Sequence, residues 1–145
     1  MFDLQVIMTT DLITVPVTAN LDSARTLMRE NRIRHLPVID EQGGVVGLLT
    51  SSDVLAATDS LLRNPDEKIR ASEIPVGDVM VTEIATVKPG ASLRQAALFL
   101  ERHKIGCLPV VDDGKLVGII TDTDFVGVAI NLLEQIEESE PVESS

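Results

Sequence analysis

Gly118-Ile119-Ile120-Thr121-Asp122-Thr123-Asp124-Phe125 is the stretch that decides the fold, because a near copy stands upstream as Gly47-Leu48-Leu49-Thr50-Ser51-Ser52-Asp53-Val54. In each copy a glycine precedes an apolar pair typical of a strand. A threonine and an aspartate three residues apart then open an apolar run typical of a helix. The chain therefore contains one structural unit twice.

The repeat extends upstream from this stretch in both copies. Ile13-Thr14-Val15 aligns with Ala85-Thr86-Val87, and the six residues from Ile33 to Val38 align with those from Ile105 to Val110. A single deletion, opposite Gln42, falls in a predicted turn before a second apolar strand. Each copy therefore predicts the order β-α-β-β-α.

The first helix of each copy is predicted to begin after Asn20 or Ser92, residue types that favour an N-cap. Behind each cap, apolar residues recur at helical spacing and predict one buried face: Leu21, Ala24, Leu27 and Met28, then Leu93, Ala96, Ala97 and Leu100. A unit this small cannot cover its own sheet, so two copies are expected to pack sheet to sheet about a pseudo-two-fold axis. The predicted class is α+β, with an α/β-like order of elements.

Prolines, charge and loss of periodicity set the predicted boundaries. We place the first repeat at residues 1–64, the linker at 65–77 and the second repeat at 78–133. Residues 134–145 are rich in Glu and Ser, so an acidic, disordered tail is expected there.

The composition excludes several classes of protein. A net charge of −11 in 145 residues argues against a nucleic-acid surface, which needs clustered Lys and Arg. The single cysteine, Cys107, leaves no intrachain disulfide. Without a leader-like segment or a long apolar run, no membrane association is expected and a cytoplasmic location is predicted.

Taken together, the repeats resemble a tandem pair of cystathionine-β-synthase (CBS) domains, the Bateman module. The resemblance rests on the paired Leu-Pro-Val strands, the Val-Gly-apolar-apolar-Thr strands and the two Thr-x-x-Asp helix starts, and it spans Val6 to Asn131. It implies two pseudo-symmetric units, a homodimer formed head to head or head to tail, and an adenosyl ligand such as AMP, ADP, ATP or S-adenosylmethionine in the clefts.

The resemblance also implies two ligand sites. The motif aspartate would accept hydrogen bonds from the ribose hydroxyls, and the helix start beside it would favour a phosphate. The first site would comprise Thr50, Ser52, Asp53, Arg34, His35, Ile84, Ala85, Ile105 and Gly106. The second site would comprise Thr121, Thr123, Asp124, Leu12, Ile13, Ile33, Arg34 and Cys107.

The two sites are not expected to be equivalent. Ala85 and Gly106 are small and would leave room for a base at the Asp53 site, where Arg34 and His35 add basic character. Ile13 is bulkier at the Asp124 site. We therefore predict that nucleotide binds first at the Asp53 site.

Simpler interpretations of the same residues stay open. Thr-x-x-Asp is also a capping box, in which the side chain of each residue accepts a hydrogen bond from the backbone N–H of the other. Arg34 and His35 are equally typical of an exposed basic turn. No catalytic or metal-ligand arrangement is present in the sequence, so we expect no enzyme, no catalytic residue and no metal site.

The function expected is that of a regulatory module sensing an adenine nucleotide, with no obligatory cofactor and with Mg²⁺ only in company with ATP. The signal would pass to an unknown protein target or to the module's own dimer. One alternative is a structural module with empty clefts. Another is a binder of S-adenosylmethionine or a related adenosyl group, which uncharged Gly106 and Cys107 would suit.

Overall fold

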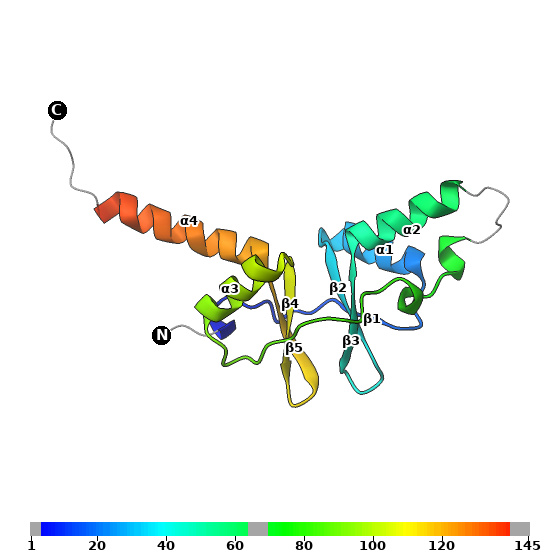
Figure 1. The fold of residues 1–145 in the computed structure, drawn as a ribbon, viewed down its shortest axis with the longest axis horizontal. Helices are drawn as coiled ribbons and strands as arrows, with labels where there is room; N and C mark the ends of the chain where they lie inside the picture. Colours follow the sequence, from blue (N-terminus) through cyan, green and yellow to red (C-terminus); the bar gives the residue numbers. More distant parts are fainter. Residues whose placement is uncertain (1–3, 64–69, 140–145) are drawn as a thin grey trace.

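The molecule consists of two repeats of similar architecture that lie side by side (Figure 1). The structure is a computed structural model that describes residues 4–63 and 70–139. The first repeat contains β1 (Val15–Pro16), α1 (Leu21–Asn31), β2 (His35–Ile39), β3 (Val45–Thr50) and α2 (Ser51–Arg63). The second contains α3 (Leu93–His103), β4 (Cys107–Asp112), β5 (Lys115–Thr121) and α4 (Asp122–Ser139). Short 3₁₀ turns occupy Leu4–Val6, Ala71–Glu73 and Val76–Asp78. The predicted α+β class is confirmed.

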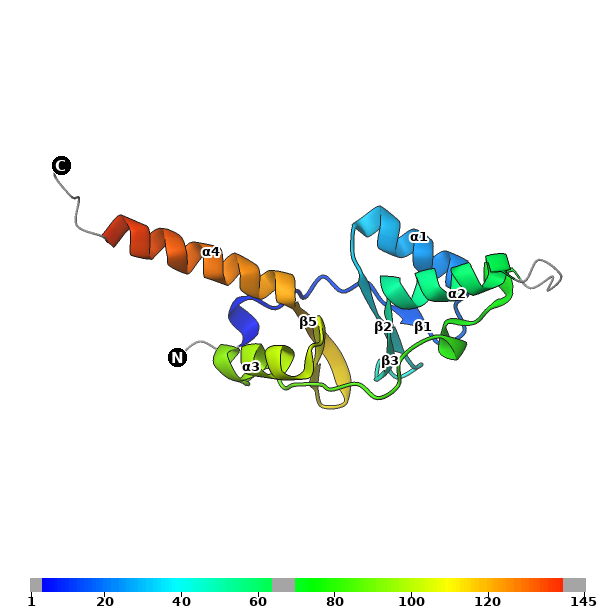
Figure 2. The ribbon, with the colours of Figure 1, turned by 45° about the horizontal axis from the view of Figure 1, so that its top comes forward.

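The two sheets lie at the centre of the molecule and the helices lie on their outer sides (Figures 1 and 2). In the first sheet β1 runs parallel to β2, and β2 runs antiparallel to β3. In the second sheet β4 and β5 are antiparallel, and Val87 bridges Val110 in parallel as Val15 pairs with Val38 in the first. The sheet arrangement therefore repeats, although the second copy of the leading strand is reduced to one bridge.

The predicted N-caps are confirmed in both repeats. The Ser23 N–H donates to Asn20 Oδ1 at 2.7 Å, and the Gln95 N–H donates to Ser92 Oγ at 3.0 Å. Each cap satisfies a backbone donor that the first turn of a helix leaves without a partner. The predicted apolar faces turn inward behind these caps, with Leu21, Ala24, Met28, Ala96 and Leu100 buried.

Each core contains a segment that precedes the other repeat. Leu4, at 0% exposure, belongs to the core of the second repeat, while Val76, also at 0%, belongs to the core of the first. Backbone bridges join Thr9 to Ile119 and Leu48 to Val81. The predicted boundaries treat each repeat as one continuous segment. In the structure, the segment around Leu4 packs into the core of the second repeat and the segment around Val76 packs into the core of the first; these are called the exchanged segments below.

This exchange explains the glycine that opens each copy of the motif. A Cβ on Gly118 would lie 2.8 Å from Met8 Sδ and 3.2 Å from the Thr9 carbonyl oxygen. A Cβ on Gly47 would meet Met80 in the same way. Glycine is needed at both positions because the methionine of an exchanged segment packs directly over the strand.

The C-terminal part of the chain differs from the prediction. Residues 134–139, expected to be disordered, continue α4 as far as Ser139. Leu132, Leu133 and Ile136 keep the helical periodicity going beyond the repeat, which explains the extension. The predicted boundary between the first repeat and the linker, at residues 64 and 65, lies outside the described residues, as do the first part of the linker and residues 140–145. Among those described, no helix has the length and apolar character needed to cross a lipid bilayer.

Candidate functional site

The two copies of Thr-x-x-Asp stand where a strand of each repeat passes into its last helix. In the first copy Asp53 Oδ2 accepts from the Thr50 N–H at 3.0 Å and from the Thr50 hydroxyl at 2.7 Å. The Asp53 N–H donates in return to Thr50 Oγ1 at 3.1 Å. This is the reciprocal geometry of a capping box, so the capping interpretation is confirmed here.

The second copy is more open. Asp124 Oδ2 accepts from the Thr121 N–H at 2.8 Å, and the Asp124 N–H donates to Thr121 Oγ1 at a longer 3.4 Å. Within the described residues, the Thr121 hydroxyl proton has no hydrogen bond to the carboxylate like the one in the first copy. Thr121 and Asp124 thus keep more hydrogen-bonding capacity for another molecule than Thr50 and Asp53 do.

A cavity of about 540 Å³ lies between the two repeats. Four segments surround it: the chain leading into β1, the turn before β2, the β3–α2 junction and the β5–α4 junction. Its lining residues are Thr9, Asp11, Leu12, Ile13, Arg32, Ile33, Arg34, His35, Pro37, Thr50, Ser51, Ser52, Ile119, Thr121, Asp122, Thr123 and Asp124. The volume falls in the range of small-molecule sites.

This cavity brings together most of the residues predicted for the second site. Those that line it are Leu12, Ile13, Ile33, Arg34, Thr121, Thr123 and Asp124. Cys107 does not line it, because that side chain is buried at 3% exposure. From the predicted first site, Thr50, Ser52, Arg34 and His35 face the same cavity.

The remaining residues predicted for the first site lie elsewhere. Asp53, Ile84 and Ala85 are only partly exposed, and none of them lines the cavity; Ala85 packs against the core of the second repeat. Ile105 and Gly106 line a different groove, of about 430 Å³, between α3 and α4. The first set is therefore divided between separate surfaces.

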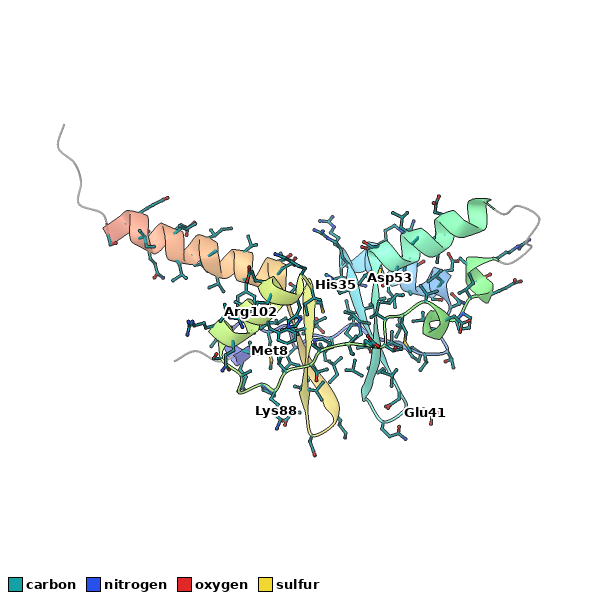
Figure 3. The ribbon with its side chains drawn as sticks, in the orientation of Figure 1. Met8, His35, Glu41, Asp53, Lys88 and Arg102 are labelled. Atoms are coloured by element: carbon teal, nitrogen blue, oxygen red, sulfur yellow. The ribbon has the colours of Figure 1, made fainter. Side chains whose placement is uncertain are left out.

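His35 explains why the room expected beside Gly106 is not open. A Cβ on Gly106 would lie 3.0 Å from His35 Nε2 and 3.3 Å from His35 Cε1. The imidazole of the first repeat thus occupies the space that glycine leaves in the second, and Figure 3 shows His35 between the two sheets. The sequence correctly indicated that the residue at position 106 is small. It did not indicate that the His35 ring fills the space beside it.

Burial governs the two titratable groups at this boundary. Loss of hydration lowers the pKa of His35, nearby Asp122 opposes that shift, and Arg34 adds to it. Burial also raises the pKa of Cys107 to about 12, and Asp122 and Asp124 act in the same direction. The imidazole is therefore biased toward its neutral form, and the thiol stays protonated at neutral pH.

The cavity carries charge of both signs. Arg32 and Arg34 supply guanidinium groups suited to a phosphate, whereas Asp11, Asp122 and Asp124 supply carboxylates suited to hydroxyl or amino groups. Asp11, Arg32 and Asp122 were not among the predicted site residues. Asp122 stands at a position of the motif that differs between the two copies, so the sequence pattern did not single it out. Its location beside the cavity identifies it as a candidate site residue. Among the described residues, no group of three His, Cys, Asp or Glu side chains is placed to hold a metal ion.

Comparison with known proteins identifies the family. The sequence model for the CBS domain matches residues 3–60 and 76–131, which together make up most of the chain. The chain belongs to the CBS domain family. The two matched segments correspond to the two repeats, so the chain is a CBS pair, as the sequence resemblance indicated.

Solved CBS pairs have the same fold as this chain. A Vibrio cholerae protein provisionally assigned to acetoin utilization, AcuB, is 43% identical with a TM-score of 0.81, over 97% of this chain and 99% of that one. CBSX2 of Arabidopsis thaliana, solved in complex with AMP, is 32% identical with a TM-score of 0.78, over 92% and 99% of the two chains. The CBS pair of protein MJ0100, solved with 5′-methylthioadenosine and S-adenosylmethionine, is 25% identical with a TM-score of 0.75, over 88% and 99%. Similar CBS pairs therefore bind adenosyl compounds.

Proposed function

We propose that this CBS pair is a regulatory module that binds an adenine nucleotide in the cavity between its repeats. The observation that carries the proposal is a cavity of about 540 Å³ lined by both repeats, with Arg32 and Arg34 from the first repeat and Thr121 and Asp124 from the second. The AMP complex of CBSX2 supports the choice of ligand class.

The residues suit the parts of such a ligand. The Asp124 carboxylate can accept both hydroxyls of a ribose, because an ionised carboxylate has several acceptor positions. Leu12, Ile13 and Ile33 offer apolar surface for a base, and the two arginines can pair with a phosphate. No catalytic step is proposed.

The structure also leads us to revise the preferred site. The sequence favoured Asp53, but the Asp53 carboxylate is engaged by the Thr50 hydroxyl and amide, and Asp53 does not line the cavity. We therefore propose Asp124 as the ribose acceptor. Thr50 and Ser52 of the first copy remain on the wall of the same cavity.

Binding would act by a population shift. A ligand that touches both repeats stabilises the relative orientation in which its contacts are complete. Besides the exchanged segments, the two hairpins meet directly, where the Leu116 N–H donates to the Gly43 carbonyl oxygen at 3.1 Å, so a change in the relative orientation of the repeats would alter this hydrogen bond. The change would pass to a partner protein or to the contact between two copies of the chain in a homodimer.

S-adenosylmethionine is the second candidate. Asp11, Asp122 and Asp124 line the cavity with three carboxylates, which would favour the sulfonium and amino groups of that ligand. The MJ0100 complex supports the same class. The cytoplasmic location, the partner protein and the use of Mg²⁺ with ATP remain predictions from the sequence.

A thermal-shift panel tests the proposal. The chain is heated alone and with millimolar AMP, ADP, ATP or S-adenosylmethionine. A ligand present at a hundred times its Kd stabilises the fold by about 2.7 kcal/mol, which raises Tm measurably. We expect the largest increase with an adenine nucleotide. An increase with S-adenosylmethionine alone favours the second candidate, and no increase with any of the four favours a structural module.

A further inference from the structure

Asp122 is the first residue of α4, and it lies in the wall of the inter-repeat cavity. Its Oδ1 accepts a hydrogen bond from the Thr123 N–H at 2.8 Å, a backbone donor of the first helical turn. Its Oδ2 lies 3.5 Å from the position that a Cβ on Gly106 would take, and His35 Nε2 lies 3.0 Å from the same position. The carboxylate is therefore close both to the start of α4 and to the His35 ring.

The first copy of the motif has no charge at this position. Ser51, the equivalent of Asp122, is the first residue of α2 and lines the same cavity. The start of a helix has free N–H groups and a partial positive charge, so it favours a phosphate. At the start of α4, the Asp122 carboxylate accepts from one of these N–H groups and adds a full negative charge. The start of α4 is therefore less suited to a phosphate than the start of α2.

The cavity has enough positive charge for one phosphate group. Arg32 and Arg34 line it, and among the described residues neither of them forms an ion pair. The His35 ring adds little positive charge at neutral pH, because burial lowers its pKa. A single phosphate group carries about −1.5 to −2 charge at pH 7, which two guanidinium groups balance. The carboxylates that line the cavity are those of Asp11, Asp122 and Asp124.

Further phosphates on the ligand would be repelled by these carboxylates. ADP and ATP carry more negative charge than AMP, and no third guanidinium group lines the cavity to balance it. Charges within one cavity lie about a Debye length apart or closer, roughly 8 Å at physiological ionic strength, so the solution screens them incompletely. Of the three carboxylates, that of Asp122 is the one at a helix start, where a phosphate would otherwise be favoured.

We propose that Asp122 is a specificity-determining residue, which makes the cavity selective for AMP over ADP and ATP. Its carboxylate repels the added phosphates of the larger nucleotides, while the two arginines balance the single phosphate of AMP. This inference rests on the proposed function, because it concerns the choice of nucleotide in the same cavity. It names the residue through which the chain would respond to AMP without responding equally to ATP.

Isothermal titration of AMP and of ATP, first without Mg²⁺, tests this selectivity in the full-length chain. The variants are Asp122→Asn, which keeps an oxygen for the Thr123 N–H, and Asp122→Ser, which introduces the residue type found at the equivalent position of the first copy. We expect wild type to bind AMP about tenfold more tightly than ATP, and both variants to reduce this ratio to about threefold or less.

Glu41→Gln is the matched control. It also removes one negative charge, but Glu41 is exposed in the turn between β2 and β3, away from His35 and the cavity (Figure 3). The ratio of the two affinities should stay at its wild-type value in this variant. In wild type itself, added salt should lower the ratio, because salt screens the repulsion between Asp122 and the added phosphates.

Three results would overturn the proposal. Wild type could bind ATP as tightly as AMP, or the ratio could stay unchanged in both Asp122 variants although thermal melting shows that they fold. Loss of ATP binding in these variants when Mg²⁺ is added would indicate that the carboxylate holds the metal ion of ATP. Each of these results leaves nucleotide binding intact, whereas wild type that binds neither nucleotide overturns the proposed function itself.

Discussion

His35 connects the two repeats at the level of a single side chain. Its ring lies against Gly106 of the other repeat, with Asp122 and Arg34 close enough to affect its charge. Because burial outweighs the attraction of Asp122, the folded protein holds the proton on His35 less firmly than the unfolded chain does. His35 therefore links acidity to the stability of the boundary between the repeats.

The stability of the protein should depend on pH through His35. With the folded pKa lowered from 6.5, the unfolded state binds more protons in mildly acidic solution, so the His35 contribution is complete above that pH and is lost as the pH falls. We expect the free energy of unfolding to decrease between pH 7 and pH 5 more in wild type than in His35→Asn. Urea denaturation at both pH values measures this difference. Equal decreases in the two proteins would contradict the account.

At the scale of elements, the exchanged segments explain features that look independent in the sequence. Gly118 lies in β5, yet its lack of a side chain is required by Met8 and Thr9, more than a hundred residues earlier. The Thr9–Ile119 bridge fixes that carbonyl in place. A Cβ at this position would have to displace the Met8 side chain and would also press on the Thr9 carbonyl oxygen.

Gly118→Ala should therefore destabilise the fold by about 1–3 kcal/mol, the usual range for an overpacked site. Gly90→Ala is the matched control, because a Cβ on Gly90 meets nothing within 4 Å. Thermal or urea unfolding gives both values. A loss in Gly118→Ala no larger than that in Gly90→Ala would contradict the packing described for Met8.

The local features of these elements could be predicted from the sequence. The N-caps Asn20 and Ser92, the apolar helix faces and the hairpins all follow from neighbouring residues, and the structure confirms them. The exchanged segments and the position of His35 depend on contacts between distant parts of the chain. Such contacts cannot be recognised from local patterns in a single sequence. The preference for Asp53 over Asp124 relied on the small size of Ala85 and Gly106 and on the basic character of Arg34 and His35, and neither property shows that the His35 ring fills the space beside Gly106.

At the scale of the whole molecule, the two cores depend on each other. Leu4 belongs to the core of the second repeat and Val76 to that of the first, so neither repeat is completed by its own contiguous segment. A ligand bound between the repeats would therefore contact two separate cores that the exchanged segments connect. Changes in the orientation of the repeats would be transmitted along the connecting segments.

Truncation of an exchanged side chain should loosen the other repeat. Leu4→Ala removes a fully buried side chain and should cost about 2–5 kcal/mol, with the first loss of amide protection in β4 and β5. Val76→Ala should affect β2 and β3 first. Hydrogen exchange followed by NMR resolves the two patterns. Uniform loss of protection in both variants would indicate that the cores are not separately affected.

Isothermal titration of AMP into wild type, Asp124→Asn and Asp53→Asn tests the central claim most directly. Both aspartates accept the backbone N–H of their motif threonine, and an asparagine oxygen can accept the same hydrogen bond in either variant, although Asp53 alone also accepts from the threonine hydroxyl. Hydrogen bonds to a charged group contribute about 1.5–3 kcal/mol, so losing those of Asp124 should weaken AMP binding about tenfold or more. We predict that loss in Asp124→Asn and a Kd within about twofold of wild type in Asp53→Asn. Loss of binding in Asp53→Asn alone, or no binding by wild type at millimolar AMP, would contradict the account.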